Sequence, residues 1–356
     1  MKIYGIFRGF PGLGRVVAGA GILSELRDRG HEVKAYSYLQ GIDVLQEYNI
    51  NNIAAPQPDI RHIMVIGLNP ISNESGILIH AIVKENPDIV IIDGEPLITS
   101  TLSMVFPKDK IICLLNKTDI DNKLLPTSTI KFYRFHYLCA GYAFVHGLTN
   151  SDYSYLMKEY NCSIHTIPTL LRPNIFNIKN NMLRHYIVGI LGGGSQNASS
   201  GFIDSTVKIG ESIIMLANYL KDEQFLIYCN DSKVSDALKV NLPNNIKVID
   251  NYTNPNIIYK NAKAILCRAG RNTISEALYL HIPTILFSTS GDFRSVEQKK
   301  NISDVCNVSK GLMQQCNIGD NVKDVAKKLD EVINKSDVNY SFEPGNRILV
   351  NFIENL

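Results

Sequence analysis

The feature that most constrains the fold is a regular alternation of short apolar runs with longer helical patterns. Residues 2–7 form an apolar run, residues 9–14 a glycine-rich turn, and residues 15–29 carry apolar side chains at helical spacing. A second apolar run follows at residues 32–36, so this segment predicts two parallel strands joined by a helix. Similar near-continuous runs, which are typical of strands covered on both faces, occur at residues 63–66, 88–93, 111–115 and 142–145.

The pattern restarts after a polar segment that contains several asparagines and a proline, residues 169–184, which we interpret as a linker. The second half predicts strands at residues 186–191, 224–229, 246–249, 262–267 and 284–287. Helices are predicted at residues 204–220, 232–240, 257–261, 272–280 and 320–335. The sequence therefore predicts an α/β protein of two doubly wound, Rossmann-like domains, residues 1–172 and 185–338. Residues 339–356 are expected to form a helix that crosses back to the first domain.

Composition excludes several other classes of protein. Apolar residues make up 45% of the chain and charged residues 20%, as in ordinary globular proteins. The 36 basic and 34 acidic residues give a net charge of only +2, so we expect no nucleic-acid partner. The seven cysteines form no C-x-x-C pair and the histidines are scattered, which predicts reduced thiols and no metal site. The sequence has neither a signal peptide's apolar core nor an apolar run of about 20 residues, so a cytoplasmic protein is expected.

The strongest local motif lies at residues 267–278, where a buried strand ends, Gly270 turns the chain and a helix starts. The free N–H groups and the dipole of such a helix start favour an anion, and Arg268 and Arg271 add cations that suit a diphosphate. Glu276, one turn further on, could accept two hydrogen bonds from the hydroxyls of a ribose. Alternatively, Thr273 and Glu276 form a capping box and bond only backbone N–H groups.

Two weaker motifs accompany it. Glycines at residues 192–194 follow a predicted strand and precede Ser195, an arrangement that lets backbone approach a phosphate closely. The segment is no P-loop, because no Gly-Lys-Ser/Thr follows. Glu297 and Gln298 come after the strand at residues 284–287 and could bond sugar hydroxyls, or they could be ordinary residues of a helix start.

Together, in this order and spacing, these motifs resemble the C-terminal domain of the GT-B nucleotide-sugar glycosyltransferases. The likeness is to glycosyltransferase family 28, the family of the lipid II-forming UDP-N-acetylglucosaminyltransferase. It implies that one glycine loop, one helix start, one acidic-amide pair and one uracil-binding loop hold the donor. The residues so implied are Gly193, Gly194, Ser195, Gln196, Thr253, Arg268, Gly270, Asn272, Thr273, Glu276, Glu297 and Gln298, with Asn301 beside the last pair.

The first half resembles the family more loosely, through Gly12-Leu13-Gly14-Arg15 and through the helix end at residues 29–33. Gly14 matches a donor-loop glycine, but Arg15 stands where the family has a histidine that assists the acceptor or binds phosphate. Arginine cannot act as a base near neutral pH, although it can neutralise a departing diphosphate. His31 lies at the far end of the predicted helix and is interpreted as a structural turn residue.

Further candidates follow two other strands. Asp93 and Glu95 lie in an Asp-Gly-Glu-Pro segment that resembles the Asp-x-Glu-Pro of related family members, and either carboxylate could take the acceptor proton. Alternatively, Asp93 caps the next helix and Pro96 occupies its first turn. Residues 116–119 match the guanine-specificity motif of GTPases. Because the sequence has no P-loop upstream, we assign no function to this match. Residues 131–137 mix cations with aromatics. This mixture suits contact with a membrane surface or with a lipid-linked or aromatic acceptor, and it equally suits a partly buried amphipathic segment.

The resemblance implies a GT-B enzyme whose two domains face each other across a cleft, the first binding the acceptor and the second the nucleotide-sugar. It implies inverting transfer of a hexosyl or N-acetylhexosaminyl group from a UDP-linked donor, with no metal and no cofactor. The acceptor, whether small molecule, glycan or lipid-linked, is not identified by the sequence, and peripheral contact with the inner face of the membrane stays open. The alternatives are a UDP-sugar hydrolase or 2-epimerase, or a sugar-nucleotide-binding subunit without turnover.

Overall fold

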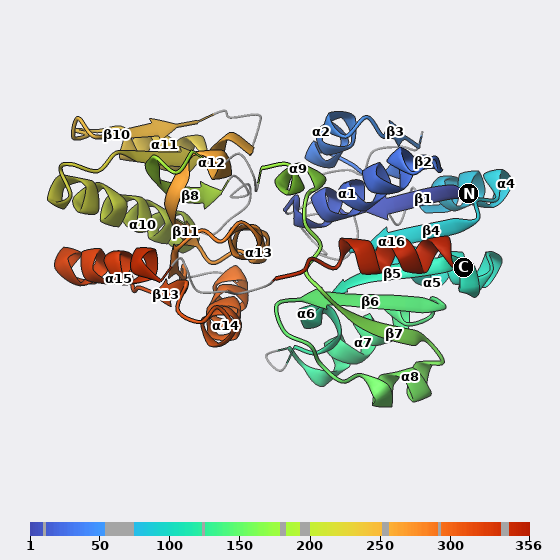
Figure 1. Ribbon diagram of the computed structural model, residues 1–356. Coiled ribbons are helices and arrows are strands. Elements are labelled where there is room, and N and C mark those ends of the chain that lie inside the picture. The colour runs from blue at the N-terminus through green and yellow to red at the C-terminus, as the bar shows by residue number, and fades with distance from the viewer. Residues whose placement is uncertain are drawn as a thin grey trace. The chain divides into compact units, whose positions relative to one another are not determined.

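The computed structural model describes residues 1–9, 12–53, 75–122, 125–178, 183–192, 200–250, 256–290, 293–335 and 342–356. The chain divides into two compact units, Met1–Pro173 with Pro344–Leu356, and Asn174–Glu343. Each unit contains one parallel sheet with helices between its strands (Figure 1). The predicted α/β class with two Rossmann-like domains is confirmed.

The sheet of the first unit has the strand order β3-β2-β1-β4-β5-β6-β7, and neighbouring strands pair in parallel. Its order reverses between β1 and β4, which makes the carboxyl ends of these two strands a topological switch point. The register places Phe7, at the end of β1, opposite Asp93, at the end of β4. The strands are β1 (Lys2–Phe7), β2 (Glu32–Tyr36), β3 (Asn51–Asn52), β4 (Ile89–Asp93), β5 (Ile111–Asn116), β6 (Tyr142–Gly147) and β7 (Ser163–Pro168).

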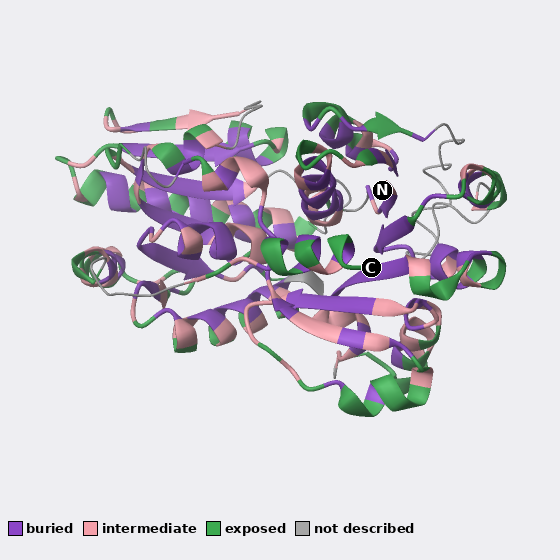
Figure 2. Cartoon of the chain, turned by 45° about the vertical axis from the view of Figure 1, so that its right-hand side comes forward, coloured by how far each residue is buried: buried purple, intermediate pink, exposed green. Residues whose placement is uncertain are grey.

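Helices cover both faces of this sheet, because its central strands are apolar on both sides (Figure 2). One core cluster joins the strands to α1 (Gly14–Asp28), α2 (Gln40–Glu47) and α16 (Asn346–Glu354). A second cluster joins them to α4 (Ser75–Glu85), α5 (Pro96–Val105), α7 (Thr127–Tyr137) and α8 (Ser154–Tyr160). A short 3-10 turn, η1 (Lys108–Lys110), precedes β5, and α6 (Lys117–Ile120) follows it.

The sheet of the second unit has the order β10-β9-β8-β11-β12-β13, and it reverses between β8 and β11. Its strands are β8 (Tyr186–Gly192), β9 (Phe225–Cys229), β10 (Ile246–Ile249), β11 (Ala262–Arg268), β12 (Thr284–Phe287) and β13 (Met313–Gln315). Side chains of α10 (Ser200–Tyr219), α11 (Ser232–Leu238) and α15 (Val322–Asn334) share one core cluster with these strands. The other helices are α9 (Pro173–Phe176), α12 (Asn256–Lys260), α13 (Arg271–Tyr279) and α14 (Phe293–Val308).

The last helix, α16, packs on the first unit. The Asn346 side chain accepts a hydrogen bond from Leu171 N and donates one to Leu171 O, both at 2.8 Å. Phe352 packs edge-on against Tyr142 and Phe144, with ring centroids 5.0 and 4.9 Å apart. These contacts tie the end of the chain to β6 and to the segment after β7.

Most predicted strands agree with the structure to within a residue or two at either end. The strand predicted at residues 63–66 lies outside the described residues. Within the described ranges, no helix is long and apolar enough to cross a bilayer. No group of three or more metal-ligating side chains occurs in those same ranges.

Candidate functional site

Two strand ends meet at the switch point of the second unit. Gly192 ends β8 and Arg268 ends β11, and the register pairs Ile190 with Cys267 just before them. Because parallel neighbours end at the same edge of a sheet, Gly192 and the Gly270 turn lie together at the carboxyl edge. The predicted donor residues Gly193, Gly194, Ser195, Gln196 and Thr253 lie outside the described residues.

Arg268 is half-buried and held from three sides. Its guanidinium carbon lies 4.9 Å from the ring centroid of Phe202, a cation–π distance. Its Nη1 donates to Thr206 Oγ1 at 3.4 Å. Gly192 has φ +73°, and a Cβ there would come within 2.3 Å of Arg268 Nη2. Arg268 therefore crosses the edge of the sheet in one defined orientation.

The helix after Arg268 presents its backbone amides at the same edge. Gly270 is the N-cap of α13 and has no side chain to cap it. Asn272 and Thr273 lie in its first, half-exposed turn, where backbone N–H groups lack helical partners. The capping-box alternative for Thr273 and Glu276 is wrong, because the helix begins at Arg271 and Thr273 is already its third residue.

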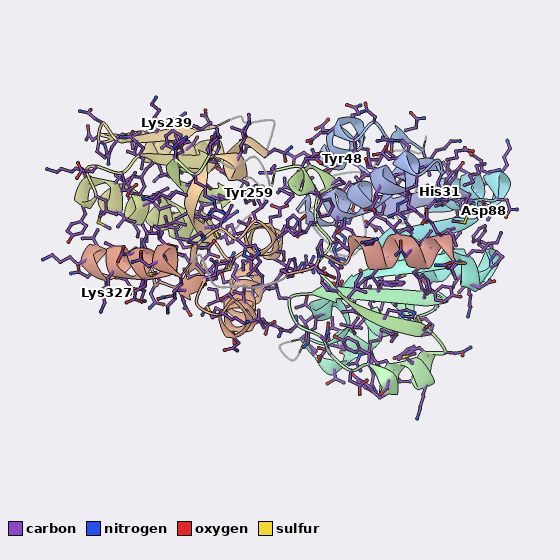
Figure 3. All side chains as sticks on the ribbon, viewed as in Figure 1. His31, Tyr48, Asp88, Lys239, Tyr259 and Lys327 are labelled. Atoms are coloured by element: carbon purple, nitrogen blue, oxygen red, sulfur yellow. The ribbon has the colours of Figure 1, made fainter. Side chains whose placement is uncertain are left out.

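Glu276 lies one turn deeper, in the interior. Its residue is 1% exposed, and its Oε2 accepts a hydrogen bond from Tyr259 Oη at 2.5 Å (Tyr259 is labelled in Figure 3). Tyr259, on α12, therefore fixes the side chain that the sequence assigns to ribose binding.

The loop after β12 is pinned by the acidic-amide segment. Gln298 Oε1 accepts hydrogen bonds from Thr289 N (2.7 Å) and Thr289 Oγ1 (3.0 Å). Asn301 Nδ2 donates to Ala269 O at 3.0 Å, which links α14 to the turn after β11. Gln298 thus commits its amide oxygen to the protein, whereas Glu297 is half-exposed on the same helix.

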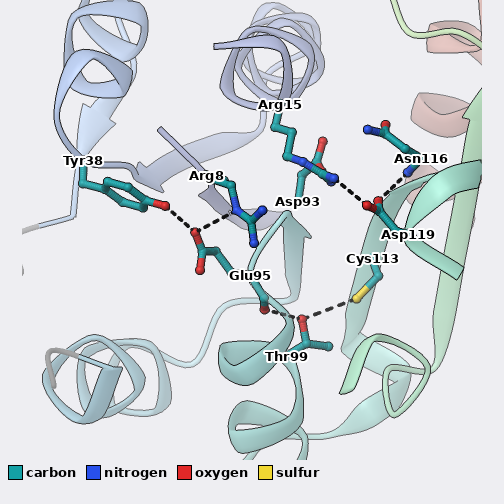
Figure 4. Close-up of polar contacts among 9 residues, drawn as sticks. All are labelled: Arg8, Arg15, Tyr38, Asp93, Glu95, Thr99, Cys113, Asn116 and Asp119. Atoms are coloured by element: carbon teal, nitrogen blue, oxygen red, sulfur yellow. Dashed lines mark hydrogen bonds and ion pairs between the residues drawn. The ribbon is translucent and has the colours of Figure 1, made fainter. Parts of the chain in front are cut away.

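The switch point of the first unit carries a compact set of charged groups (Figure 4). Arg15, in the first turn of α1 beside Gly14, donates from Nη1 to Asp93 Oδ1 at 2.5 Å and from Nη2 to Asp119 Oδ1 at 2.7 Å. The side chains of Arg15, Asp93 and Asp119 are only 14%, 1% and 13% exposed. The charge of Arg15 is therefore already balanced by two carboxylates of its own unit.

Asp119 is a member of this set that sequence reasoning missed. Its Oδ2 accepts a hydrogen bond from Asn116 N at 2.7 Å, and Asn116 caps the same turn in return, a capping box at the start of α6. The segment that imitates a guanine-binding motif therefore positions a carboxylate on Arg15. The capping-box pattern was readable in the sequence, but its contact with Arg15 was not.

Glu95 occupies a different environment from Asp93. It is the N-cap residue of α5 without a side-chain capping bond, and Pro96 is at the first helical position. The alternative in which Asp93 caps this helix is wrong. Glu95 Oε1 accepts a hydrogen bond from Tyr38 Oη at 2.8 Å and lies 3.8 Å from Arg8 Nε. Burial raises the pKa of Glu95 to about 7, against the opposing influence of Arg8 and Tyr38.

Gly94 makes this arrangement possible. Its φ is +88°, and a Cβ there would come within 2.5 Å of Arg15 Cδ and 2.7 Å of Arg8 Cβ. The backbone therefore passes between the two arginines and sends Asp93 to one and Glu95 to the other. Within the described part of the chain, Arg8 Nε and Nη2 are buried without a hydrogen bond.

Two other predicted segments have structural contacts. His31 Nε2 lies 3.2 Å from Glu354 Oε1, which joins the end of α1 to α16 as part of the fold. In the aromatic segment at residues 131–137, Tyr137 is buried and Phe135 is 60% exposed, so α7 is a partly buried amphipathic helix.

Residues 187–348 match the sequence profile of the glycosyltransferase family 28 C-terminal domain. The chain carries a glycosyltransferase family 28 C-terminal domain. No curated protein matches the sequence. Solved structures that are similar over the whole of both chains include Acinetobacter baumannii MurG (14% identity, TM-score 0.59, 100% of each chain). They also include the spinosyn rhamnosyltransferase SpnG with thymidine diphosphate (14%, 0.66, 100% of each) and Neisseria meningitidis UDP-GlcNAc 2-epimerase bound to UDP-GlcNAc (15%, 0.64, 100% of each). With the two parallel sheets, these likenesses show a GT-B fold.

The family 28 domain thus has Arg268, Gly270, Asn272 and Thr273 at one switch point, with Glu276 buried behind them. The other unit of this GT-B chain has Arg15, Asp93 and Glu95 at its own switch point. Ligands of doubly wound sheets bind outside such strand ends, so each unit offers one place for a substrate.

Proposed function

We propose that this protein is a glycosyltransferase that moves a hexosyl or N-acetylhexosaminyl group from a UDP-linked donor to an acceptor with inversion. One observation carries the proposal: the family 28 domain places Arg268 and the open start of α13 together at the β8–β11 switch point. A cation and the backbone amides of a helix's first turn, together at one strand edge, are suited to the diphosphate of an activated sugar. The chemistry needs no metal or cofactor in this proposal.

Each donor group has a proposed partner. Arg268, Gly270, Asn272 and Thr273 would hold the diphosphate, and Glu276 would accept hydrogen bonds from ribose hydroxyls. The remaining donor contacts stay as the resemblance implies them, at Gly14, Gly193, Gly194, Ser195, Gln196, Thr253, Glu297 and Gln298.

The reaction joins the acceptor oxygen to the anomeric carbon and breaks that carbon's bond to the diphosphate oxygen. Negative charge develops on the departing UDP, where Arg268 and the α13 amides stabilise it. The acceptor proton goes to a base, and Glu95 is a better candidate than Asp93 because Asp93 is already bonded to Arg15. With its charge balanced by Asp93 and Asp119, Arg15 is proposed to fix the site, with any help to the leaving group secondary.

Calorimetric titration with UDP, TDP and GDP tests the donor assignment. UDP should bind most tightly, and Glu276→Ala should weaken UDP at least about tenfold, since a lost hydrogen bond to a charged group costs about 1.5–3 kcal/mol. Glu211→Ala, an exposed carboxylate on α10, is the matched control and should leave UDP affinity unchanged. A folded Glu276→Ala variant with wild-type UDP affinity would remove the ribose role.

A second candidate, acceptor-free turnover by a UDP-sugar hydrolase or 2-epimerase, is favoured by one observation. Arg15 stands in place of the family histidine and is bonded to two carboxylates. The similar N. meningitidis structure is a 2-epimerase by its printed name. Incubation with UDP-sugars alone discriminates: fast, stoichiometric sugar release or epimer formation favours this candidate. UDP binding without turnover, restored by a cell extract, would instead indicate a binding subunit.

A further inference from the structure

We propose that Gly192, Phe202 and Thr206 are positioning residues that hold Arg268 ready for the diphosphate of the donor. The inference rests on the proposed function, because it concerns the same site. These three residues, which we call the seat of the Arg268 guanidinium, lie on β8 and α10. The rest of the site is made by β11 and α13. Neither the sequence motifs nor the family likeness assigned a role to Phe202 or Thr206.

Phe202 contributes the aromatic face over which the Arg268 guanidinium lies. It is the third residue of α10 and only 2% exposed, so its ring is fixed by the core around it. The guanidinium carbon of Arg268 lies 4.9 Å from the ring centroid. A cation over an aromatic face is attracted to it, and the contact strengthens where water is excluded.

Thr206, one turn further along α10, contributes a hydrogen-bond acceptor for the guanidinium. Its hydroxyl donates to Phe202 O at 2.8 Å, which uses its only hydrogen. The oxygen can therefore act only as an acceptor toward Arg268 Nη1, 3.4 Å away. A hydroxyl committed in this way favours a cation at this position over another acceptor.

Gly192 supplies the space. A Cβ at this position would come within 2.3 Å of Arg268 Nη2, and the backbone has φ +73°, which side chains rarely adopt. Glycine at the end of β8 is thus what lets the guanidinium lie across the strand ends. Three residues on two neighbouring elements, β8 and α10, therefore converge on one orientation of Arg268.

A cation held in place loses less conformational freedom when it binds an oxyanion than one on a mobile side chain. The seat should therefore strengthen the contribution of the phosphates to donor affinity. It should not change the contribution of the nucleoside. Inorganic pyrophosphate and uridine separate these two parts experimentally, and UDP combines them.

Calorimetry or competition titration of the full chain with UDP, inorganic pyrophosphate and uridine tests the proposal. Phe202→Leu, which keeps apolar volume but removes the ring, should weaken UDP and pyrophosphate about fivefold and leave uridine within about twofold. Gly192→Ala should weaken the two phosphate ligands about tenfold or more, because the methyl group displaces the guanidinium. Phe225→Leu, a buried phenylalanine at the start of β9, is the control and should change none of the three affinities.

Equal losses for uridine and UDP in Phe202→Leu would overturn the seat, as would unchanged pyrophosphate affinity in both Phe202→Leu and Gly192→Ala. If Phe202→Leu does not fold, Thr206→Val provides the same test: it should weaken UDP and pyrophosphate, by less than Phe202→Leu, and leave uridine affinity unchanged. Arg268→Gln separates this inference from the proposed function. Unchanged UDP affinity in Arg268→Gln would contradict the proposed donor site itself. Weaker UDP binding in Arg268→Gln, with unchanged binding in the Phe202, Thr206 and Gly192 variants, would contradict only the seat.

Discussion

Asp93 and Glu95 are two residues apart, yet the structure gives them different partners. Asp93 bonds to Arg15, a fully formed ion pair. Glu95 has a phenol at 2.8 Å and a guanidinium only at 3.8 Å, and its side chain is 3% exposed. Desolvation is then the dominant effect on Glu95, and its carboxyl holds a proton at a higher pH than an exposed glutamate does.

This difference predicts a pH-dependent effect of Glu95→Gln on the free energy of unfolding. Burial raises the pKa of Glu95 from 4.5 to about 7, so the folded state binds its proton more tightly than the unfolded state. That stabilisation is fully present below pH 4.5 and is lost as the pH rises to about 7. Glutamine cannot ionise. The free energy of unfolding of Glu95→Gln should therefore rise relative to that of the wild type, by up to about 3 kcal/mol, as the pH is raised from 4.5 to 8.

Urea unfolding at a series of pH values measures this gain. Glu211→Gln, exposed on α10, should show no pH-dependent difference from the wild type. A constant offset between Glu95→Gln and the wild type across the whole range would contradict the buried, proton-binding environment. The same series could not be designed from the sequence, where Asp93 and Glu95 were equal candidates.

The limits of sequence reasoning at this scale follow from distance along the chain. Gly14, Arg15, Asp93 and Glu95 stand in local motifs next to predicted strand ends, so the sequence could place them at the sheet edge. The Asp119 contact with Arg15 spans 104 residues, and Tyr38 reaches Glu95 across 57. Nothing in a local pattern encodes such pairs, because they depend on which strands are neighbours in the sheet.

Among elements, central strands were predictable and most edge strands were not. Buried parallel strands read as near-continuous apolar runs, which is why β4, β5 and β11 were found. β3, β7 and β13 lie at the edges of their sheets and were missed. Two of these are only two or three residues long, and β7 is partly exposed and ends in Pro168, so none of them carries an apolar run.

The terminal helix α16 gives a prediction at this scale. Asn346→Ala should lower the free energy of unfolding of the first unit by about 2–4 kcal/mol, because both backbone groups of buried Leu171 lose their partner. Asn351→Ala, exposed on the same helix, should change stability by less than about 0.5 kcal/mol. An Asn346→Ala loss no larger than that of Asn351→Ala would mean that α16 is not held at this position.

At the level of the whole molecule, the chain enters the second unit near residue 174 and leaves it near residue 343. Each unit has its own core clusters and its own switch point, so each can respond separately to ligand and to mutation. Assignment of the donor to the second unit therefore has a thermodynamic consequence. A ligand that binds only a folded unit stabilises that unit.

UDP at about 100 times its dissociation constant should stabilise the second unit by about 2.7 kcal/mol, which raises its unfolding temperature by about 5–10 °C for a unit of this size. Differential scanning calorimetry measures the shift, and hydrogen exchange assigns it to residues 174–343 by protection near the ends of β8 and β11. Asn346→Ala should lower the transition of the first unit and leave the UDP shift intact, since it acts on the other core. GDP at the same concentration serves as the ligand control. Protection by UDP confined to β1 and β4 would place the nucleotide on the first unit and reverse the proposed assignment of donor and acceptor.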